Sequence, residues 1–128
     1  MKPCQETALE KRARVLLETL NKEIGQMEEL WQQGNQSVFL VLRIYQTEAE
    51  RLRKRLEGNP KTLRQRLVAL NRDLTRRAKG EASIATDPYD PAWRETRQAW
   101  ERVQQSAALR RDALTKLTTR LGNVIRPG

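Results

Sequence analysis

Hydrophobic residues recur every three or four positions along most of this 128-residue chain, a spacing typical of amphipathic α-helices. The pattern predicts three helices in the first two thirds of the chain, over residues 7–33, 37–57 and 60–79. Each carries an apolar stripe that would face a common core. The stripe positions are Leu9, Ala13, Leu16, Leu20, Ile24, Met27 and Trp31 in the first, Val38, Val41, Tyr45, Ala49, Leu52 and Leu56 in the second, and Leu63, Leu67, Leu70 and Leu74 in the third.

Turn-forming residues mark the expected ends of these helices. Gly34-Asn35 ends the first helix, and Gly58 ends the second as a C-terminal glycine. An asparagine–proline pair then supplies the N-cap and first residue of the third helix. Gly80 is expected to stop that helix, which leaves residues 80–90 as an acidic loop.

A fourth and longer helix is predicted over residues 91–121, with Asp90 as its N-cap. Its seam follows a heptad spacing that is interrupted once, by Arg110. The Arg110 stem could lie along the seam with its guanidinium in solvent. Alternatively, Arg110 pairs with a buried acid such as Glu18 or Glu48, or sets the register of an oligomer. The seam comprises Trp93, Trp100, Val103, Ala107, Arg110, Leu114, Leu117 and Leu121.

These elements predict an all-α fold, an antiparallel bundle of three to four helices with a long C-terminal helix. The length suits one domain over residues 1–128, and the short links between the first three helices favour antiparallel neighbours. No run of apolar residues approaches the 18 or so that a membrane span requires. The N-terminus lacks the apolar segment of a signal peptide, so we expect a cytoplasmic protein that does not enter a membrane.

The start of the second helix is apolar on every face, over Val38–Ile44. Burial by several neighbouring helices would explain this run. An interface with a protein partner or a second copy of the chain would also explain it, and a short strand is a third alternative.

Charge changes this picture, because the net charge of +9 is unevenly distributed. Residues 59–80 contain seven Lys and Arg residues but only one acid, Asp73. On a helical wheel, Lys61, Arg72, Arg76 and Lys79 lie opposite the four leucines, so they form an outward stripe of a single sign. Like charges four residues apart disfavour a helix, so the stripe needs either compensating acids or a functional reason.

Two interpretations of the stripe compete. Acids of the first helix could pair with it across the bundle; these are Glu18, Glu23, Glu28 and Glu29. Alternatively, the stripe binds a polyanion, and the usual one for a basic helical face is DNA or RNA. Residues 59–128 contain 12 Arg and 3 Lys, and the excess of arginine suits bidentate phosphate contacts. An acidic protein or an anionic lipid surface is a third, weaker possibility.

The candidate nucleic-acid-binding residues are basic residues of the last two predicted helices. They are Lys61, Arg64, Arg66, Arg72, Arg76, Arg77, Lys79, Arg110, Arg111, Lys116 and Arg120. Five of the six aromatic residues lie on or beside apolar stripes, so we expect them in the core. Tyr89 alone would be free to stack on a base, which favours contact with the nucleic-acid backbone over base reading.

The chain has no His and one Cys, Cys4, which argues against zinc sites, CxxC sites and His-based catalysis. It also lacks phosphate-binding glycine motifs. We therefore expect no metal, no cofactor and no enzymatic activity. The sequence favours a non-enzymatic nucleic-acid-binding accessory protein; the alternative is a protein–protein interaction module such as an adaptor, a chaperone or an inhibitor.

Overall fold

The computed structural model describes residues 7–92 and 96–127. In this part of the chain there are four α-helices and no strand, which confirms the all-α prediction and the long C-terminal helix. The helices are α1 (Ala8–Gln32), α2 (Phe39–Leu56), α3 (Leu63–Thr86) and α4 (Arg97–Ile125). Short 3-10 turns, Gln36–Val38 and Pro60–Thr62, precede α2 and α3.

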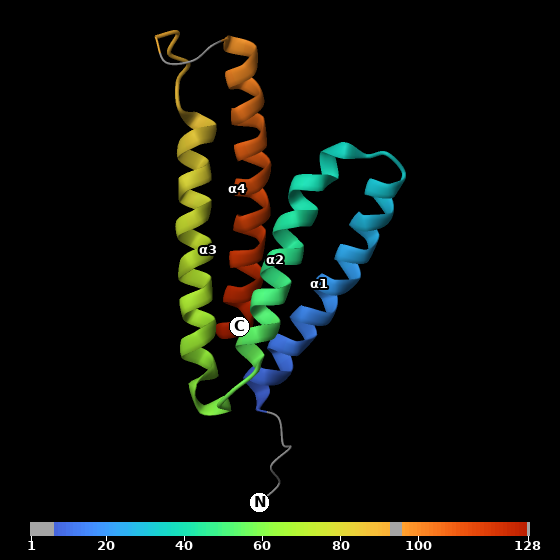
Figure 1. Cartoon of the computed structure of the whole chain (residues 1–128). Helices are drawn as coiled ribbons and strands as arrows, with labels where there is room; N and C mark the ends of the chain where they lie inside the picture. The colour runs from blue at the N-terminus through green and yellow to red at the C-terminus, as the bar shows by residue number, and fades with distance from the viewer. Residues whose placement is uncertain (1–6, 93–95, 128) are drawn as a thin grey trace, which may run out of the picture.

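The helices form two antiparallel hairpins, α1–α2 and α3–α4 (Figure 1). The α3–α4 pair packs along its length, and α2 and α1 pack against α4 at the end where α2 links to α3. At the opposite end, the α1–α2 turn leans away from α4 (Figure 1). No helix among the described residues combines the length and apolar character that a membrane span requires.

Local signals explain where α1 and α3 begin and where α1 and α2 end. Thr7 and Glu10 form a reciprocal capping box at the start of α1. The Asn59 side chain accepts a hydrogen bond from the Lys61 backbone N–H and so caps the turn before α3. The two links contain Gly34 and Gly58, whose φ angles of +96° and +98° only glycine adopts without strain.

The core is centred on the leucine stripe of α3. Leu63, Leu67, Leu70 and Leu74 are all buried, as predicted, and they pack in one cluster with the seam of α4 and the stripes of α1 and α2. Each such leucine contributes roughly 1.5–3 kcal/mol through removal of its side chain from water.

The stripes leave the core where the hairpins diverge. Trp31 is 46% exposed, Phe39 is 40% exposed and Val103 is 44% exposed. The prediction that these aromatic residues are core was therefore wrong, because a stripe is buried only where another helix faces it. The indole of Trp31 instead packs on the ring of Phe39, with 5.5 Å between centroids. Trp93 lies outside the described residues.

The apolar run over Val38–Ile44 has a mixed outcome. It enters a helix, so the strand alternative was wrong. Leu42 and Ile44 are buried in the bundle, whereas Phe39 faces solvent in part. Burial by neighbouring helices therefore accounts for Leu42 and Ile44, whereas the other apolar residues of the run are half-buried or exposed.

Gly80 does not stop the third helix. α3 continues to Thr86, and α4 begins at Arg97 with Thr96 as its N-cap, so the predicted loop 80–90 and the predicted start at Asp90 were wrong. A glycine inside a helix costs only about 1 kcal/mol relative to alanine, which packing against α4 outweighs. α4 also runs past the predicted end at residue 121, to Ile125.

The extension of α3 provides the partner of Arg110. The Arg110 guanidinium lies 3.0 Å from the Glu81 carboxylate, so this pair joins α3 to α4. The partners suggested by the sequence, Glu18 and Glu48, were wrong because Glu81 was assigned to a loop rather than to the facing helix. With Glu81 opposite it, the polar break in the seam is an ion pair between neighbouring helices.

Candidate nucleic-acid interface

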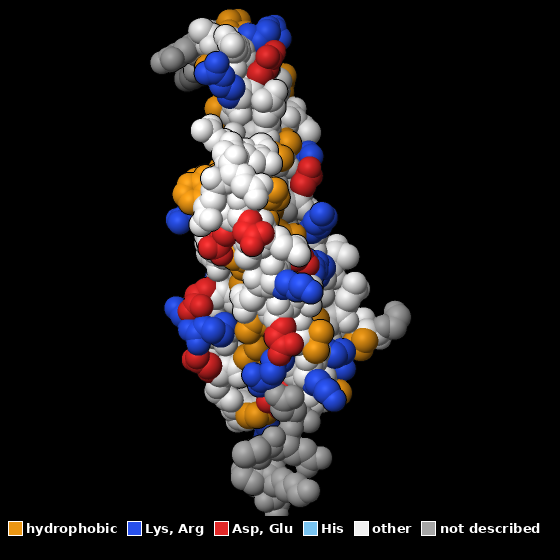
Figure 2. All heavy atoms as spheres, turned by 90° about the vertical axis from the view of Figure 1, so that its right-hand side faces the viewer, with side chains coloured by type: hydrophobic (Ala, Val, Ile, Leu, Met, Phe, Trp, Pro, Cys, Tyr) orange, Lys and Arg blue, Asp and Glu red, His pale blue; other side chains and the backbone are white. Residues whose placement is uncertain are grey.

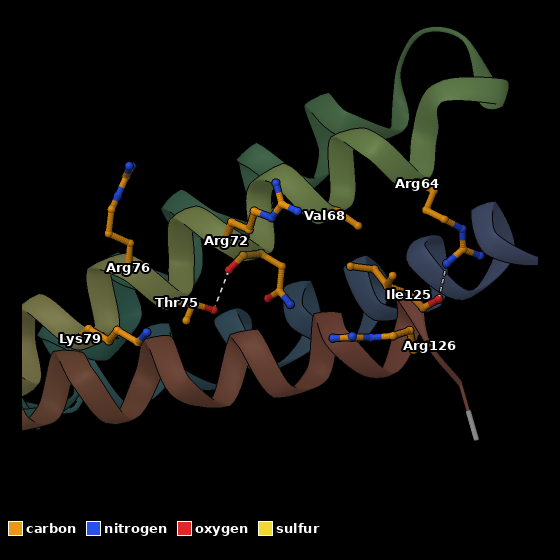
Figure 3. Close-up of a pocket in the computed structure, with 9 residues that line it drawn as sticks. Arg64, Val68, Arg72, Thr75, Arg76, Lys79, Ile125 and Arg126 are labelled. Carbon is orange, nitrogen blue, oxygen red and sulfur yellow. Dashed lines mark hydrogen bonds between the residues drawn. The ribbon is translucent and has the colours of Figure 1, made fainter.

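A groove runs between α3 and the C-terminal part of α4, and its charged lining is entirely basic (Figure 3). Its volume is about 640 Å³. A second hollow continues it towards the start of α3 and shares Arg64, Val68 and Arg72 with it. We call the two hollows together the basic groove. The cations that line it are Lys61, Arg64, Arg72, Arg76, Lys79 and Arg126.

The helical repeat of α3 brings most of the basic groove together. Lys61 opens the turn before the helix, and Arg72, Arg76 and Lys79 follow on the face away from the leucines. Eighteen residues separate Lys61 from Lys79, which corresponds to roughly 27 Å at 1.5 Å per residue. The chain therefore displays a nearly straight row of cations on a rigid support.

Arg126 directly follows the last residue of α4 and adds a sixth cation to the basic groove, and it was not among the predicted site residues. Its side chain lies along the floor between the two helices (Figure 3). The prediction ended the helix at Leu121, so Arg126 fell in an unassigned tail. The signal was present, because Val124 and Ile125 continue the apolar seam and are buried.

Arg64 has a structural role as well as a place in the groove. Its guanidinium donates a hydrogen bond to the carbonyl of Ile125, and Arg12 of α1 donates one of 2.9 Å to the carbonyl of Val124. The last carbonyls of a helix lack intrahelical donors, and a positive charge there is favourable. Two arginines from different helices thus hold the C-terminal end of α4.

Arg76 is a highly exposed cation of the basic groove that also forms an ion pair. Its side chain is 80% exposed and donates a 2.6 Å hydrogen bond to Asp73 one turn earlier. Asp73 offsets part of the repulsion between Arg72 and Arg76. Because Arg76 projects away from the floor (Figure 3), a ligand could reach it without displacing a packed side chain.

Two other predicted site residues of α3 face elsewhere. Arg66 donates hydrogen bonds to the carbonyls of Arg55 and Asn59, so it fastens the link between α2 and α3. Arg77 donates to the buried Glu48 of α2 at 2.8 Å. Both arginines are held by structural contacts and neither lines the basic groove.

Glu48 is the centre of a charged network between α2 and α3. Its carboxylate is only 3% exposed and accepts hydrogen bonds from Arg51 and Arg77, both at 2.8 Å. Arg51 also lies 2.8 Å from Asp73. The Arg51 guanidinium holds the pKa of Asp73 below its ordinary value, and Arg76 acts in the same direction.

The four predicted site residues of α4 also lie off the groove. Arg110 pairs with Glu81, and Arg111 lies 3.0 Å from Asp112. Arg120 donates two hydrogen bonds of 2.7 Å to Glu23, which lowers the pKa of Glu23. Exposed Lys116 lines a different hollow, together with Tyr45.

The acids of α1 do not neutralise the basic groove as the first interpretation required. Glu23 pairs with Arg120 of α4, while Glu18, Glu28 and Glu29 are exposed. Among the described residues, the ion pairs of α3 with other helices join it to α2 and, through Glu81 and Arg110, to α4. Its remaining ion pairs are within the helix and involve Asp73. On the face over α1 and α2, acidic and basic side chains are interspersed (Figure 2), in contrast to the groove.

Aromatic side chains contribute nothing to the groove lining. Tyr45 is buried, and the Trp100 indole donates a 3.3 Å hydrogen bond to the carbonyl of Asp87. The Tyr89 ring lies in the loop after α3, as predicted, and one of its faces packs under the guanidinium of Arg97 at 4.8 Å.

Among residues 7–92 and 96–127, no three or more His, Cys, Asp or Glu side chains gather in a way that could hold a metal ion. Besides its cations, the larger hollow of the basic groove is lined by the neutral side chains of Val68, Asn71, Thr75 and Ile125. This arrangement suits an anion that is long rather than compact.

No protein-family model, curated protein or solved structure matches this chain.

Proposed function

We propose that this protein is a non-enzymatic nucleic-acid-binding accessory protein that grips a phosphate backbone in the basic groove. The single observation behind the proposal is the groove's lining, which contains six cations and no acid. Its length of roughly 27 Å fits a polymer of regularly spaced phosphates better than a single small anion.

The division of the arginines supports this function. Several arginines elsewhere on α3 and α4 have carboxylate or carbonyl partners, as the Arg77–Glu48 and Arg120–Glu23 pairs illustrate. Arg72 and Lys79 are exposed in the groove, where a phosphate would supply the missing negative charge. Phosphate contacts of this kind position a protein on nucleic acid without reading its sequence.

The decisive experiment is the double charge reversal Arg72→Glu/Arg76→Glu, measured by fluorescence anisotropy with labelled 20-mer oligonucleotides. We expect affinity to fall by more than about 100-fold, since two phosphate contacts become repulsive. The free energy of unfolding should change by less than about 0.5 kcal/mol, because both side chains are on the surface.

The matched control is Lys22→Glu/Lys54→Glu, which makes the same change in net charge at exposed positions of α1 and α2. Its affinity should fall by less than about fivefold, through the long-range field alone. Equal losses in the two variants would show that net charge, not the groove, governs binding. Absence of binding by the unmodified protein at about 50 mM salt would refute the proposal.

A second candidate function, a protein–protein interaction module, is favoured by one observation. Trp31 and Phe39 pack on each other at the exposed α1–α2 turn, where no other helix covers them. Such residues are common at interfaces. Light scattering that shows a dimer, reduced to a monomer by Trp31→Ser/Phe39→Ser, would support this function through self-association; a monomer that binds nucleic acid would favour the first.

A further inference from the structure

The basic groove lacks the side chains with which proteins usually hold single strands. Single-strand sites combine a positive groove with aromatic rings on which successive bases stack. The apolar side chains that line the two hollows are Val68, Ala69 and Ile125, and all three are aliphatic. Unpaired bases would therefore gain no stacking surface on this face of the protein.

The described aromatic rings are committed or distant. Tyr45 is in the core, and Tyr89 is covered by Arg97. Trp31 and Phe39 are at the α1–α2 turn, which belongs to the other hairpin (Figure 1). The Trp100 indole donates a hydrogen bond to the Asp87 carbonyl. None of these rings lines the two hollows of the basic groove.

The row itself matches a ligand that is already straight. Lys61 to Lys79 span roughly 27 Å along one side of a helix. A duplex presents its phosphates along that length in a fixed array, and its bases stack on each other. A single strand has to be ordered against the helix at the expense of its conformational entropy.

We propose that the basic groove selects paired over unpaired nucleic acid, with α3 lying against the phosphates of a duplex. This inference rests on the proposed function and narrows its ligand to a duplex. The contacts would come from Arg72, Arg76 and Lys79 on one side and from Arg126 on the other (Figure 3). Because these contacts reach only phosphate, the choice of base sequence should not matter.

The test compares the full chain's affinity for three labelled ligands of one sequence at about 100 mM salt: a 20-base-pair DNA duplex, the same RNA duplex and the single DNA strand. We expect the DNA duplex, the RNA duplex or both to bind at least about tenfold more tightly than the strand. The two duplex arms also show which geometry fits the groove. A strand that binds as tightly as the more tightly bound duplex overturns this inference but leaves the proposed function intact; no binding to any of the three ligands removes both.

A gain-of-contact variant separates stacking from charge. Ala69 is exposed and lies in the groove between Gln65 and Arg72, so Ala69→Trp adds a ring without changing the charge. We expect single-strand affinity to rise several-fold and the duplex-to-strand ratio to shrink; Ala69→Leu is the control for added bulk. If Ala69→Trp left the duplex-to-strand affinity ratio unchanged, the lack of an aromatic stacking surface would not explain why single strands are disfavoured.

Discussion

The two sides of α3 carry the same residue types in opposite surroundings. On the side facing α2, Arg77 meets Glu48 at 2.8 Å and Asp73 at 3.8 Å. On the side facing the end of α4, Arg72 and Lys79 line a groove that contains no acid. Since both sides belong to one basic helix, a count of charges along the sequence does not identify a binding surface. The acids of the neighbouring helices decide which arginines remain available.

The largest loss of stability should come from a change on the side of α3 that faces α2, where acids neutralise the arginines. Glu48→Gln leaves Arg51 and Arg77 without their buried carboxylate, and we expect a loss of about 2 kcal/mol in the free energy of unfolding. This value is below the usual cost of a broken buried pair because both guanidinium groups are partly exposed. Urea denaturation followed by circular dichroism measures it. An unchanged unfolding midpoint would show that the network does not join α2 to α3.

A matched pair of single substitutions contrasts the two sides directly. Arg72→Gln should weaken nucleic-acid binding by roughly fivefold to tenfold and reduce the slope of log K against log salt by about one, without altering stability. Arg77→Gln should lower stability by about 1 kcal/mol and leave affinity unchanged. Anisotropy titrations at several salt concentrations, together with urea melts, test both. If Arg77→Gln weakened binding as much as Arg72→Gln, the distinction between the two sides would be wrong.

Acid should weaken the network before it affects the groove. The pKa of Asp73 is lowered in the folded protein, first by its hydrogen bond from Arg51. A carboxyl whose pKa is lower when folded stabilises the protein above the pKa of the unfolded chain, about 3.9 for Asp, and this stability is lost as pH falls through the folded value. We therefore expect stability to decline below about pH 4, less steeply in Asp73→Asn. Thermal melts between about pH 2 and 7 would reveal parallel curves if Asp73 made no contribution.

The smallest effect is expected far from either side of α3. Trp31→Ser removes a half-exposed indole that contacts Phe39, so stability should change by less than about 1 kcal/mol and nucleic-acid affinity should not change. The same urea and anisotropy measurements apply. A large stability loss would show that the α1–α2 turn is packed more tightly than its exposure indicates.

The helices could be predicted well because their signals are local. The leucine stripe of α3 follows from spacing alone, and Gly34 and Gly58 end helices because the links require positive φ angles. Gly80 is also a glycine, but its backbone does not need a positive φ angle. A prediction from the residue type alone therefore placed the end of α3 too early. The difference lies in the contacts that α3 makes with α4, including the Glu81–Arg110 pair, and these depend on tertiary structure.

The groove could be predicted only in part, for a related reason. The outward stripe of Lys61, Arg72, Arg76 and Lys79 follows from the wheel, and the structure places all four along the two hollows. Arg66 and Arg77 have the same charge, but the neighbouring α2 supplies a carbonyl to the first and a carboxylate to the second. Arg126 joins the groove from a distant part of the sequence, so only the packing of α4 beside α3 brings it there.

The two arginines at the end of α4 have a consequence for how the molecule opens. Arg12 and Arg64 bind adjacent carbonyls, and they come from the first and second hairpins respectively. Separation of the two hairpins breaks the Arg12 bond to Val124, and separation of α3 from α4 within the second hairpin breaks the Arg64 bond to Ile125, so both openings expose a carbonyl at this end. The amide hydrogens in the last turns of α4 should therefore exchange with solvent only through global unfolding, while those near the α1–α2 turn exchange through local fraying.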